Sequence, residues 1–240
     1  MKTLVISFGI LLLILNETYA ARIFCRTRYR RVLPARRVAA QSNARREQPK
    51  SKLLTSLGEE LFDGQTLKGW TIIEEYDFER HGEVAIKDNA IVLAAGKPAT
   101  GIRLDRDFPR TNYEVALEAK RIEGSDFFCG ITFPVGDSYL SLVLGGWGGG
   151  TTGLSNLDSM SAIENATTGF QEFEQNRWYR IRLRVTEARV EAWIDDEQIV
   201  DVDHTMHKLS IWWEQEPVRP FGIASWYTTS ALRDLRLKRL

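Results

Sequence analysis

From Trp70 to the end of the chain, short segments with the two-residue period of β-strands follow one another, and no long stretch has a helical period. In RIRLRV at 180–185, Ile181, Leu183 and Val185 alternate with arginines, which puts the apolar side chains on one face. The predicted strands are Trp70–Glu74, Glu83–Lys87, Ala90–Ala94, Tyr113–Arg121, Phe127–Phe133, Tyr139–Leu144, Trp178–Thr186, Arg189–Ile194, Gln198–Val202, Phe221–Tyr227 and Leu232–Arg239. Such a series favours an all-β jelly-roll sandwich of two antiparallel sheets.

The centre of this series is a hairpin with two apolar strands, Phe127–Phe133 and Tyr139–Leu144, joined by a short Pro-Val-Gly-Asp connection. A loop at 145–153 follows it, in which six of the nine residues are glycine. Glycine lets the backbone approach a ligand closely, and an exposed indole offers a flat apolar face on which a sugar ring can stack. We therefore predict substrate contacts at Gly146, Trp147 and Gly148. The alternative is that Trp147 folds back onto the core.

The composition predicts a single globular domain with an uneven distribution of charge. The 240 residues are 43% hydrophobic and 27% charged, with a net charge of zero. Residues 21–52 contain eleven Lys or Arg and one acid, whereas the chain from Leu53 onward contains twenty Lys or Arg and thirty acids. An acidic domain argues against nucleic acid as its partner. The basic segment is interpreted as a solvated arm, and an arm that contacts RNA or anionic lipid is the alternative.

The first residues resemble an export signal. An apolar run from Leu4 to Leu15 precedes small residues at Thr18 and Ala20, so we predict a signal peptide over 1–21 and an exported protein, periplasmic or extracellular. The run is too short for a comfortable membrane span. Arginines after the run oppose translocation, which leaves a mis-assigned start or an uncleaved anchor as alternatives. Residues 22–57 are predicted to be a basic disordered linker, and residues 58–240 the folded domain.

Four segments resemble the 3-keto-disaccharide hydrolase family, also described as 3-keto-glucoside lyases and hydratases. They are LFDGQTLKGW at 61–70, NYEVALEAKRIEG at 112–124, RWYRIRLRVTEARVEAWIDDEQIVD at 177–201 and FGIASWYTTSALRDLRLKRL at 221–240. The resemblance implies a concanavalin-A-like fold and a carbohydrate ligand. The middle of the chain differs from the family pattern, because apolar residues at 128–133 and Gly145–Gly146 stand where the pattern has polar ones.

Cleavage of a 3-keto-glycoside needs a base beside the carbonyl and an acid at the leaving oxygen. Carboxylates can serve as both, and we predict Glu118, Asp126 and Glu164 as catalytic candidates. The resemblance aligns Glu118 with the family's strand glutamate, and the alternative is a solvated outward charge. The rival to an enzyme is a catalytically silent module that binds sugar or protein.

No cofactor is indicated with certainty, and a divalent metal ion is left open. The segment 201–207 holds Asp201, Asp203, His204 and His207, but this spacing matches no strong metal signature. Two cysteines imply no disulfide framework. The pattern predicts no particular oligomeric state.

Adjacent Trp212 and Trp213 would point to opposite faces of a strand, so one of them is expected to be exposed. We choose Trp213 as the residue that could join Trp147 in a platform for sugar rings. An aromatic, uncharged concave face would favour a binding module, whereas inward carboxylates with a divalent ion would favour an enzyme.

Overall fold

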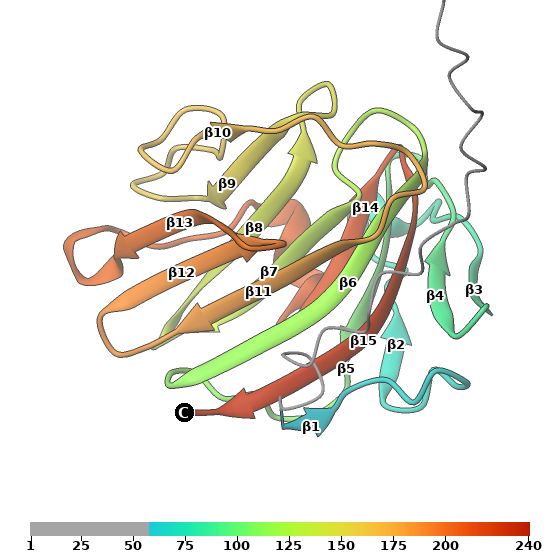
Figure 1. Ribbon diagram of the computed structural model, residues 1–240, viewed down its shortest axis with the longest axis horizontal. Coiled ribbons are helices and arrows are strands. Elements are labelled where there is room, and N and C mark those ends of the chain that lie inside the picture. Colours follow the sequence, from blue (N-terminus) through green and yellow to red (C-terminus); the bar gives the residue numbers. More distant parts are fainter. Residues whose placement is uncertain (1–57) are drawn as a thin grey trace, which may run out of the picture. The chain divides into compact units, whose positions relative to one another are not determined.

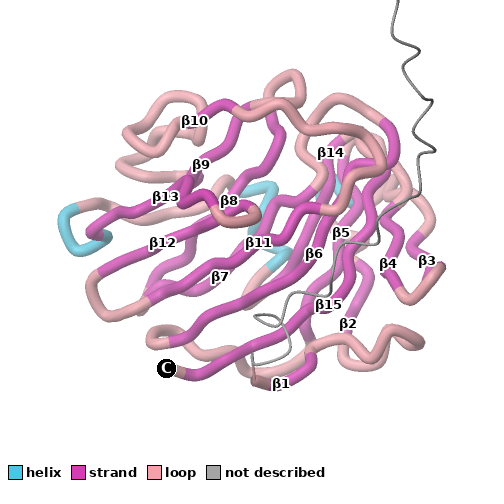
Figure 2. Tube along the Cα trace, viewed as in Figure 1, coloured by secondary structure: helices cyan, strands magenta, loops and turns pink. Residues whose placement is uncertain are grey.

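The computed structural model describes residues 58–240, so the predicted signal peptide and linker lie outside the described residues. Figure 1 shows a β-sandwich, and Figure 2 shows that strands and loops make up nearly all of it. The strands are β1 Glu59–Glu60, β2 Trp70–Ile72, β3 Val84–Lys87, β4 Ala90–Leu93, β5 Ala99–Leu104, β6 Tyr113–Glu123, β7 Cys129–Val135, β8 Ser138–Gly146, β9 Thr151–Ser155, β10 Gly169–Phe170, β11 Tyr179–Val185, β12 Arg189–Ile194, β13 Glu197–Asp203, β14 Gly222–Trp226 and β15 Thr229–Arg239. This confirms the predicted fold class.

The helices are short 3₁₀ turns: η2 Tyr76–Phe78, η3 His204–Met206 and η4 Trp213–Val218. None of the helices between residues 58 and 240 is long and apolar enough to cross a membrane.

The strands form two antiparallel sheets. The eight-stranded sheet has the order β13-β12-β11-β6-β15-β4-β3, and β1 pairs with β15 beside this path. The seven-stranded sheet has the order β10-β9-β8-β7-β14-β5-β2. Each sheet therefore mixes strands from distant parts of the chain, as in a jelly roll.

The core between the sheets follows from the alternation in the strands. Ile181, Leu183 and Val185 of β11 are all buried, and the arginines between them are partly exposed, as predicted. Aromatic rings fill the core at one end, where Phe108 stacks on Phe221 with ring centroids 4.3 Å apart. The core is continuous across both sheets, which fixes the frame on which the loops are mounted.

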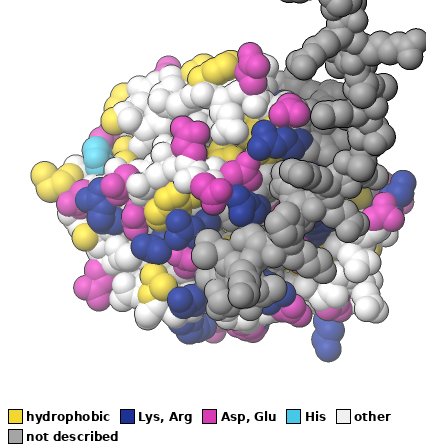
Figure 3. Space-filling model, viewed as in Figure 1, with side chains coloured by type: hydrophobic (Ala, Val, Ile, Leu, Met, Phe, Trp, Pro, Cys, Tyr) yellow, Lys and Arg dark blue, Asp and Glu magenta, His cyan; other side chains and the backbone are white. Residues whose placement is uncertain are grey.

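Acidic and basic side chains are interspersed on the visible part of the outer face of the eight-stranded sheet (Figure 3), where Arg182 pairs with Glu114 and Arg233 with Glu118. Two tryptophans on this face lie against cationic side chains of the protein. The Trp178 ring has Arg233 at 4.1 Å and Lys120 at 4.7 Å, and the Trp193 ring has Arg182 at 3.7 Å. These indoles are thus already engaged in cation–π contacts.

The glycine-rich loop is shorter than the sequence predicts. Strand β8 continues to Gly146 and strand β9 begins at Thr151, so that only a tight turn at 147–150 separates them. Strand β9 pairs antiparallel with β8 and extends the sheet beyond the predicted hairpin. The turn therefore lies at the end of two paired strands, which restrains it at both ends.

Candidate functional site

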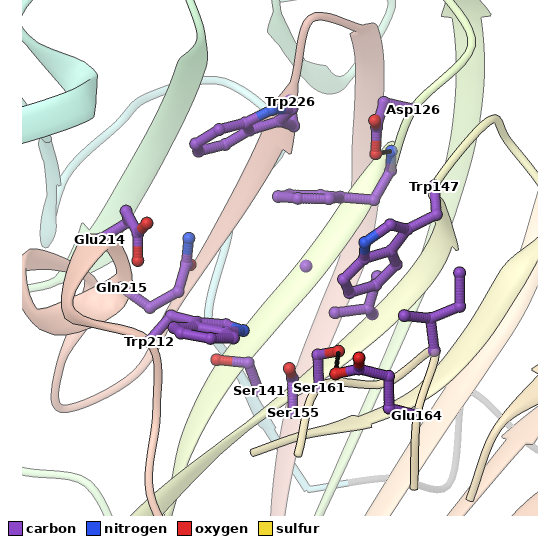
Figure 4. Close-up of a pocket in the computed structure, with 14 residues that line it drawn as sticks. Asp126, Ser141, Trp147, Ser155, Ser161, Glu164, Trp212, Glu214, Gln215 and Trp226 are labelled. Atoms are coloured by element: carbon purple, nitrogen blue, oxygen red, sulfur yellow. Dashed lines mark hydrogen bonds between the residues drawn. The ribbon is translucent and has the colours of Figure 1, made fainter. Parts of the chain in front are cut away.

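A pocket of about 440 Å³ lies on the outer face of the seven-stranded sheet, the face turned away from the core. We call it the tryptophan pocket. Its floor is formed by β7, β8 and β9, and its walls by the turn at 147–150, the loop at 156–168, the segment around η4 and the end of β14. Figure 4 shows its side chains converging from these elements. A cavity of this volume is in the range of small-molecule sites, about 300–1,000 Å³.

The floor consists of outward residues that are cross-strand neighbours. Gly130 lies opposite Val143, and Ser141 lies opposite Ser155. Gly130 leaves room for an aromatic ring over the strand, because a Cβ at this position would lie 2.9 Å from Cε2 of Phe127. The floor is therefore largely apolar, because its two hydroxyl groups already have partners: Ser141 Oγ bonds with Thr132 Oγ1 at 2.9 Å, and Ser155 Oγ donates to Asn156 Oδ1 at 3.0 Å.

Three indoles surround the pocket: Trp147 from the turn after β8, Trp212 just before η4 and Trp226 at the end of β14. Trp147 and Trp212 are each 44% exposed. In Figure 4, Trp147 and Trp212 lie on opposite sides of the pocket, and Trp226 is on a third side. Exposed indoles on several sides of a cavity can hold a flat ring by its faces.

A buried arginine from the opposite sheet supports the turn that carries Trp147. Arg121 in β6 is 5% exposed. Its Nη2 donates hydrogen bonds to the backbone carbonyls of Asp126, Gly145 and Gly149 at 3.1, 3.1 and 2.8 Å. Burial lowers the pKa of the Arg121 guanidinium from its ordinary value, and the nearby Asp126 charge opposes that change. The guanidinium thus connects three backbone carbonyls from two separate segments of the chain, the residues before β7 and the end of β8 with the turn after it.

The close approach of Arg121 explains two of the glycines. A Cβ on Gly145 would collide with the Arg121 guanidinium, and one on Gly149 would lie 3.3 Å from Nη1. Both residues also have positive φ angles, 80° and 104°, which L side chains rarely adopt. These glycines therefore serve the turn geometry.

Asp126 lines the pocket from the segment before β7. Its Oδ1 accepts a hydrogen bond from the Phe127 N–H at 2.7 Å. Burial raises the pKa of the Asp126 carboxyl above its ordinary value, while the N–H groups of Phe127 and Trp147 and the charge of Arg121 act against the rise. The carboxyl therefore holds its proton to higher pH than a fully solvated aspartate does.

Glu164 lines the pocket from a loop that is held by a buried asparagine. The Nδ2 of Asn165 donates to the carbonyls of Leu154 and Ser161 at 2.7 and 2.8 Å, and its Oδ1 accepts from the hydroxyl of Thr167 at 2.6 Å. The Asn-Ala-Thr sequence at 165–167 thus has a structural use. Glu164 Oε2 accepts a hydrogen bond from the Ser161 hydroxyl at 2.8 Å.

Glu214 and Gln215 of η4 line the opposite side (Figure 4). The segment leading to them is tied to the 156–160 loop, since Asp158 accepts hydrogen bonds from the Lys208 N–H at 2.8 Å and pairs with His207 at 2.7 Å. The His207 hydrogen bond is the main cause that lowers the pKa of the exposed Asp158 carboxyl. Glu214 Oε2 is buried and has no hydrogen-bond partner within residues 58–240.

The structure brings together some of the predicted site residues and separates others. Asp126, Glu164 and Trp147 all line the tryptophan pocket. Glu118 lies on the other sheet, where its Oε2 accepts from Arg233 Nε at 2.7 Å. Trp213 is 57% exposed outside the pocket, against the ring of Tyr76, and its neighbour Trp212 occupies the pocket wall.

The two predicted glycine contacts differ in their surroundings. Gly146 is buried at the end of β8, and a Cβ added there would lie 2.9 Å from Val143. Gly148 is at the open tip of the turn, where a Cβ would meet nothing within 4 Å. Gly148 is thus the more open of the two, but neither glycine lines the tryptophan pocket.

The donor set does not fit a metal ion. Within the described part of the chain, no three His, Cys, Asp or Glu side chains are grouped so that they could hold one. Cys129 is fully buried in the core, and burial raises the pKa of its thiol, which makes it a small apolar residue. We assign neither a metal nor a nucleophilic cysteine to the pocket.

Residues 58–238 match the family of 3-keto-alpha-glucoside-1,2-lyase-like domains. The chain belongs to this family. The match confirms the resemblance seen in the four sequence segments, and the domain is carbohydrate-related. No curated protein matches the chain.

Solved structures share the fold of this 3-keto-alpha-glucoside-1,2-lyase-like domain. One is a protein from Parabacteroides distasonis provisionally named a glycosyl hydrolase, with 15% identity and a TM-score of 0.50, covering 79% of this chain and 97% of the other. Another is the carbohydrate-binding module CBM66 from Bacillus subtilis, with 11% identity and a TM-score of 0.50, covering 71% and 95%. A Bacillus subtilis protein of unknown function with a galectin-like fold has 13% identity and a TM-score of 0.51, covering 76% and 97%.

Several pocket residues of this family member were not predicted. Trp212 is the neighbour of the predicted Trp213, and the adjacency of the two tryptophans was the sequence signal that could have indicated Trp212. Glu214 and Gln215 have no local signal, because they enter the site only through the way η4 packs on the sheet. Ser141 could have been found from strand alternation, since it occupies an outward position between the buried Leu140 and Leu142. Ser155 could not, because every residue of β9 is buried.

Proposed function

We propose that the tryptophan pocket binds a glucoside-type glycan, with sugar rings stacked on its indoles. The observation that carries the proposal is the presence of three tryptophans around one cavity whose walls also carry the polar side chains of Asp126, Glu164 and Gln215. Apolar ring faces and a few placed polar groups are what a sugar, with its own apolar faces and hydroxyl rim, requires. The family name, which refers to a glucoside, supports this ligand class. The apolar segment at 1–21 leads us to propose that the protein meets the glycan after export.

The test is titration calorimetry of the purified full chain with maltotetraose, cellotetraose and trehalose. We expect the Trp147→Ala and Trp212→Ala variants each to weaken binding by about 2 kcal/mol, roughly thirty-fold, because each removes one stacking face from the cavity. Trp213→Ala is the matched control. Its indole is equally large and more exposed, but it lies outside the pocket, so its affinity should equal that of the wild type. Equal losses in all three variants would contradict the assignment of this pocket.

A second candidate function is cleavage of a 3-keto-glycoside in the same pocket. It is favoured by the carboxylates of Asp126 and Glu164 on the pocket wall and by the raised pKa of Asp126. A carboxyl that keeps its proton to higher pH is better suited to protonate a leaving oxygen, while a second carboxylate can remove the proton beside the ketone. We therefore propose Asp126 as the acid and Glu164 as the base of this reaction. Glu118 is left out, because it lies on the other sheet.

The reaction is tested by incubating the full chain with a 3-keto-α-glucoside and following its loss by chromatography. An enzyme should lose roughly a hundredfold or more of its turnover in both Asp126→Asn and Glu164→Gln, with binding retained, since each variant keeps the shape of the side chain and removes its proton transfer. Glu118→Gln is the control and should retain full turnover. Binding without turnover in the wild type would leave the glycan-binding function and exclude the enzyme.

A further inference from the structure

The tryptophan pocket is acidic. Asp126, Glu164 and Glu214 line it, and no lysine, arginine or histidine of the described residues does so. The charge of Asp126 is partly balanced by the nearby Arg121 guanidinium. Glu164 is bonded to a neutral hydroxyl, and Glu214 Oε2 is buried without a hydrogen-bond partner in residues 58–240. The pocket thus has an excess of negative charge and a buried acceptor without a hydrogen-bond donor.

The indoles of the pocket also differ from those elsewhere in the protein. On the opposite sheet, Trp178 lies against Arg233 and Lys120, and Trp193 lies against Arg182. In the part of the chain that the structure describes, no basic side chain lies over Trp147, Trp212 or Trp226. Their electron-rich faces are therefore free to attract a cation from outside the protein.

We propose that the preferred ligand of the tryptophan pocket carries a positive charge, and that it is an amino sugar with a free ammonium group. The choice of a sugar rests on the proposed function, and the charge rests on the pocket itself. An ammonium group has three donors, and the carboxylates of Asp126, Glu164 and Glu214 that line the pocket are acceptors. Its charge is attracted both by the carboxylates and by the indole faces.

The test compares three tetrasaccharides in calorimetric titrations of the full chain at pH 6 and low salt: the β-1,4-glucosamine tetramer, its fully N-acetylated form and cellotetraose. We expect the glucosamine tetramer to bind about tenfold more tightly than either neutral sugar, and the preference to shrink as salt is added. The preference should disappear as the pH rises through the pKa of the sugar ammonium, because the neutral amine lacks the charge.

Glu214→Gln tests the source of the preference. This variant keeps the size of the side chain and removes its charge, so the ratio of glucosamine-tetramer affinity to cellotetraose affinity should fall several-fold. The matched control is Glu216→Gln in the same short helix, whose side chain is 43% exposed and pairs with Arg219 outside the pocket. It should keep the full preference. If both variants lose the preference equally, Glu214 is not the partner of the ammonium, and the inference is overturned.

A fourth probe, tetramethylammonium chloride, separates this inference from the proposed function. Equal binding of all three tetrasaccharides would overturn the inference and leave glycan binding in place. Binding of tetramethylammonium, sensitive to Trp147→Ala, in a protein that binds none of the sugars would overturn the glycan function and leave a cation site. Binding of none of the four probes would overturn both.

Discussion

Replacement of Arg121 by leucine is expected to lower the free energy of unfolding by about 3 kcal/mol, measured by urea denaturation. The variant removes the donor that the carbonyls of Asp126, Gly145 and Gly149 share. The Asp126 carbonyl keeps the hydrogen bond from the Thr228 hydroxyl at 3.1 Å, so the loss falls on the two glycine carbonyls. Each buried carbonyl left unpaired costs about 1–3 kcal/mol, and leucine recovers part of the loss because it needs no hydration.

The same variant should loosen the turn at 147–150. Hydrogen exchange of this turn is expected to become at least tenfold faster, whereas exchange in β7 should change only by the global loss of stability. Arg177→Leu is the matched control. Arg121 lies over the ring of Phe128 at 5.3 Å, and Arg177 lies over the ring of Tyr179 at 4.5 Å, but the Arg177 side chain is 40% exposed. If both variants lose the same stability, stacking on aromatic rings accounts for the effect, and the carbonyl contacts do not.

Replacement of Tyr113 by alanine is expected to lower the free energy of unfolding by about 4 kcal/mol. Tyr113 in β6 is fully buried, its ring meets Phe108 edge-on at 5.2 Å, and its hydroxyl donates to the carbonyl of Pro134 in β7 at 2.7 Å. The side chain therefore links the two sheets, and its removal leaves both a cavity and an unpaired carbonyl. Burial raises the pKa of the phenol, so the hydroxyl remains a donor at neutral pH.

Tyr113→Phe separates the two contributions. It keeps the ring and removes only the hydrogen bond, so we expect a loss of about 1 kcal/mol in the same denaturation experiment. Tyr76→Ala, at a side chain that is 58% exposed, should change stability by less than about 0.5 kcal/mol. A phenylalanine variant as unstable as the alanine variant would show that the hydroxyl contact dominates over packing.

Local alternation was sufficient to predict the strands that have one face on the core and one in solvent. Strand β11 is the clearest case, because its burial alternates residue by residue. The same rule failed for β5 and β9. In β9 all five residues are buried, because loops cover its outer face. Its sequence, Thr-Thr-Gly-Leu-Ser, contains only one large apolar side chain and therefore shows no alternation. In β5, Ala99 packs in a second apolar cluster with Phe78 of η2, outside the main core. Strands covered on both faces lose the period that identifies them.

The candidate site was predictable where the signal lay in a single loop and unpredictable where it depended on packing. Trp147 could be singled out because it stands among glycines. The choice between Trp212 and Trp213 assumed a strand, but the chain enters η4 at this point, and both side chains are partly exposed. Arg121 gave no local sign of its role, because its three acceptors come from the segment before β7 and from the far end of the opposite sheet.

The floor of the tryptophan pocket and the main core are built from alternate residues of the same strands. In β8, Leu142 and Leu144 face the core while Ser141 and Val143 face the pocket. Mutations at the outward positions therefore change the pocket floor while the inward leucines stay in place. The same two-residue period that builds the sandwich thus divides each of these strands between two surfaces, one that holds the sheets together and one that shapes the cavity.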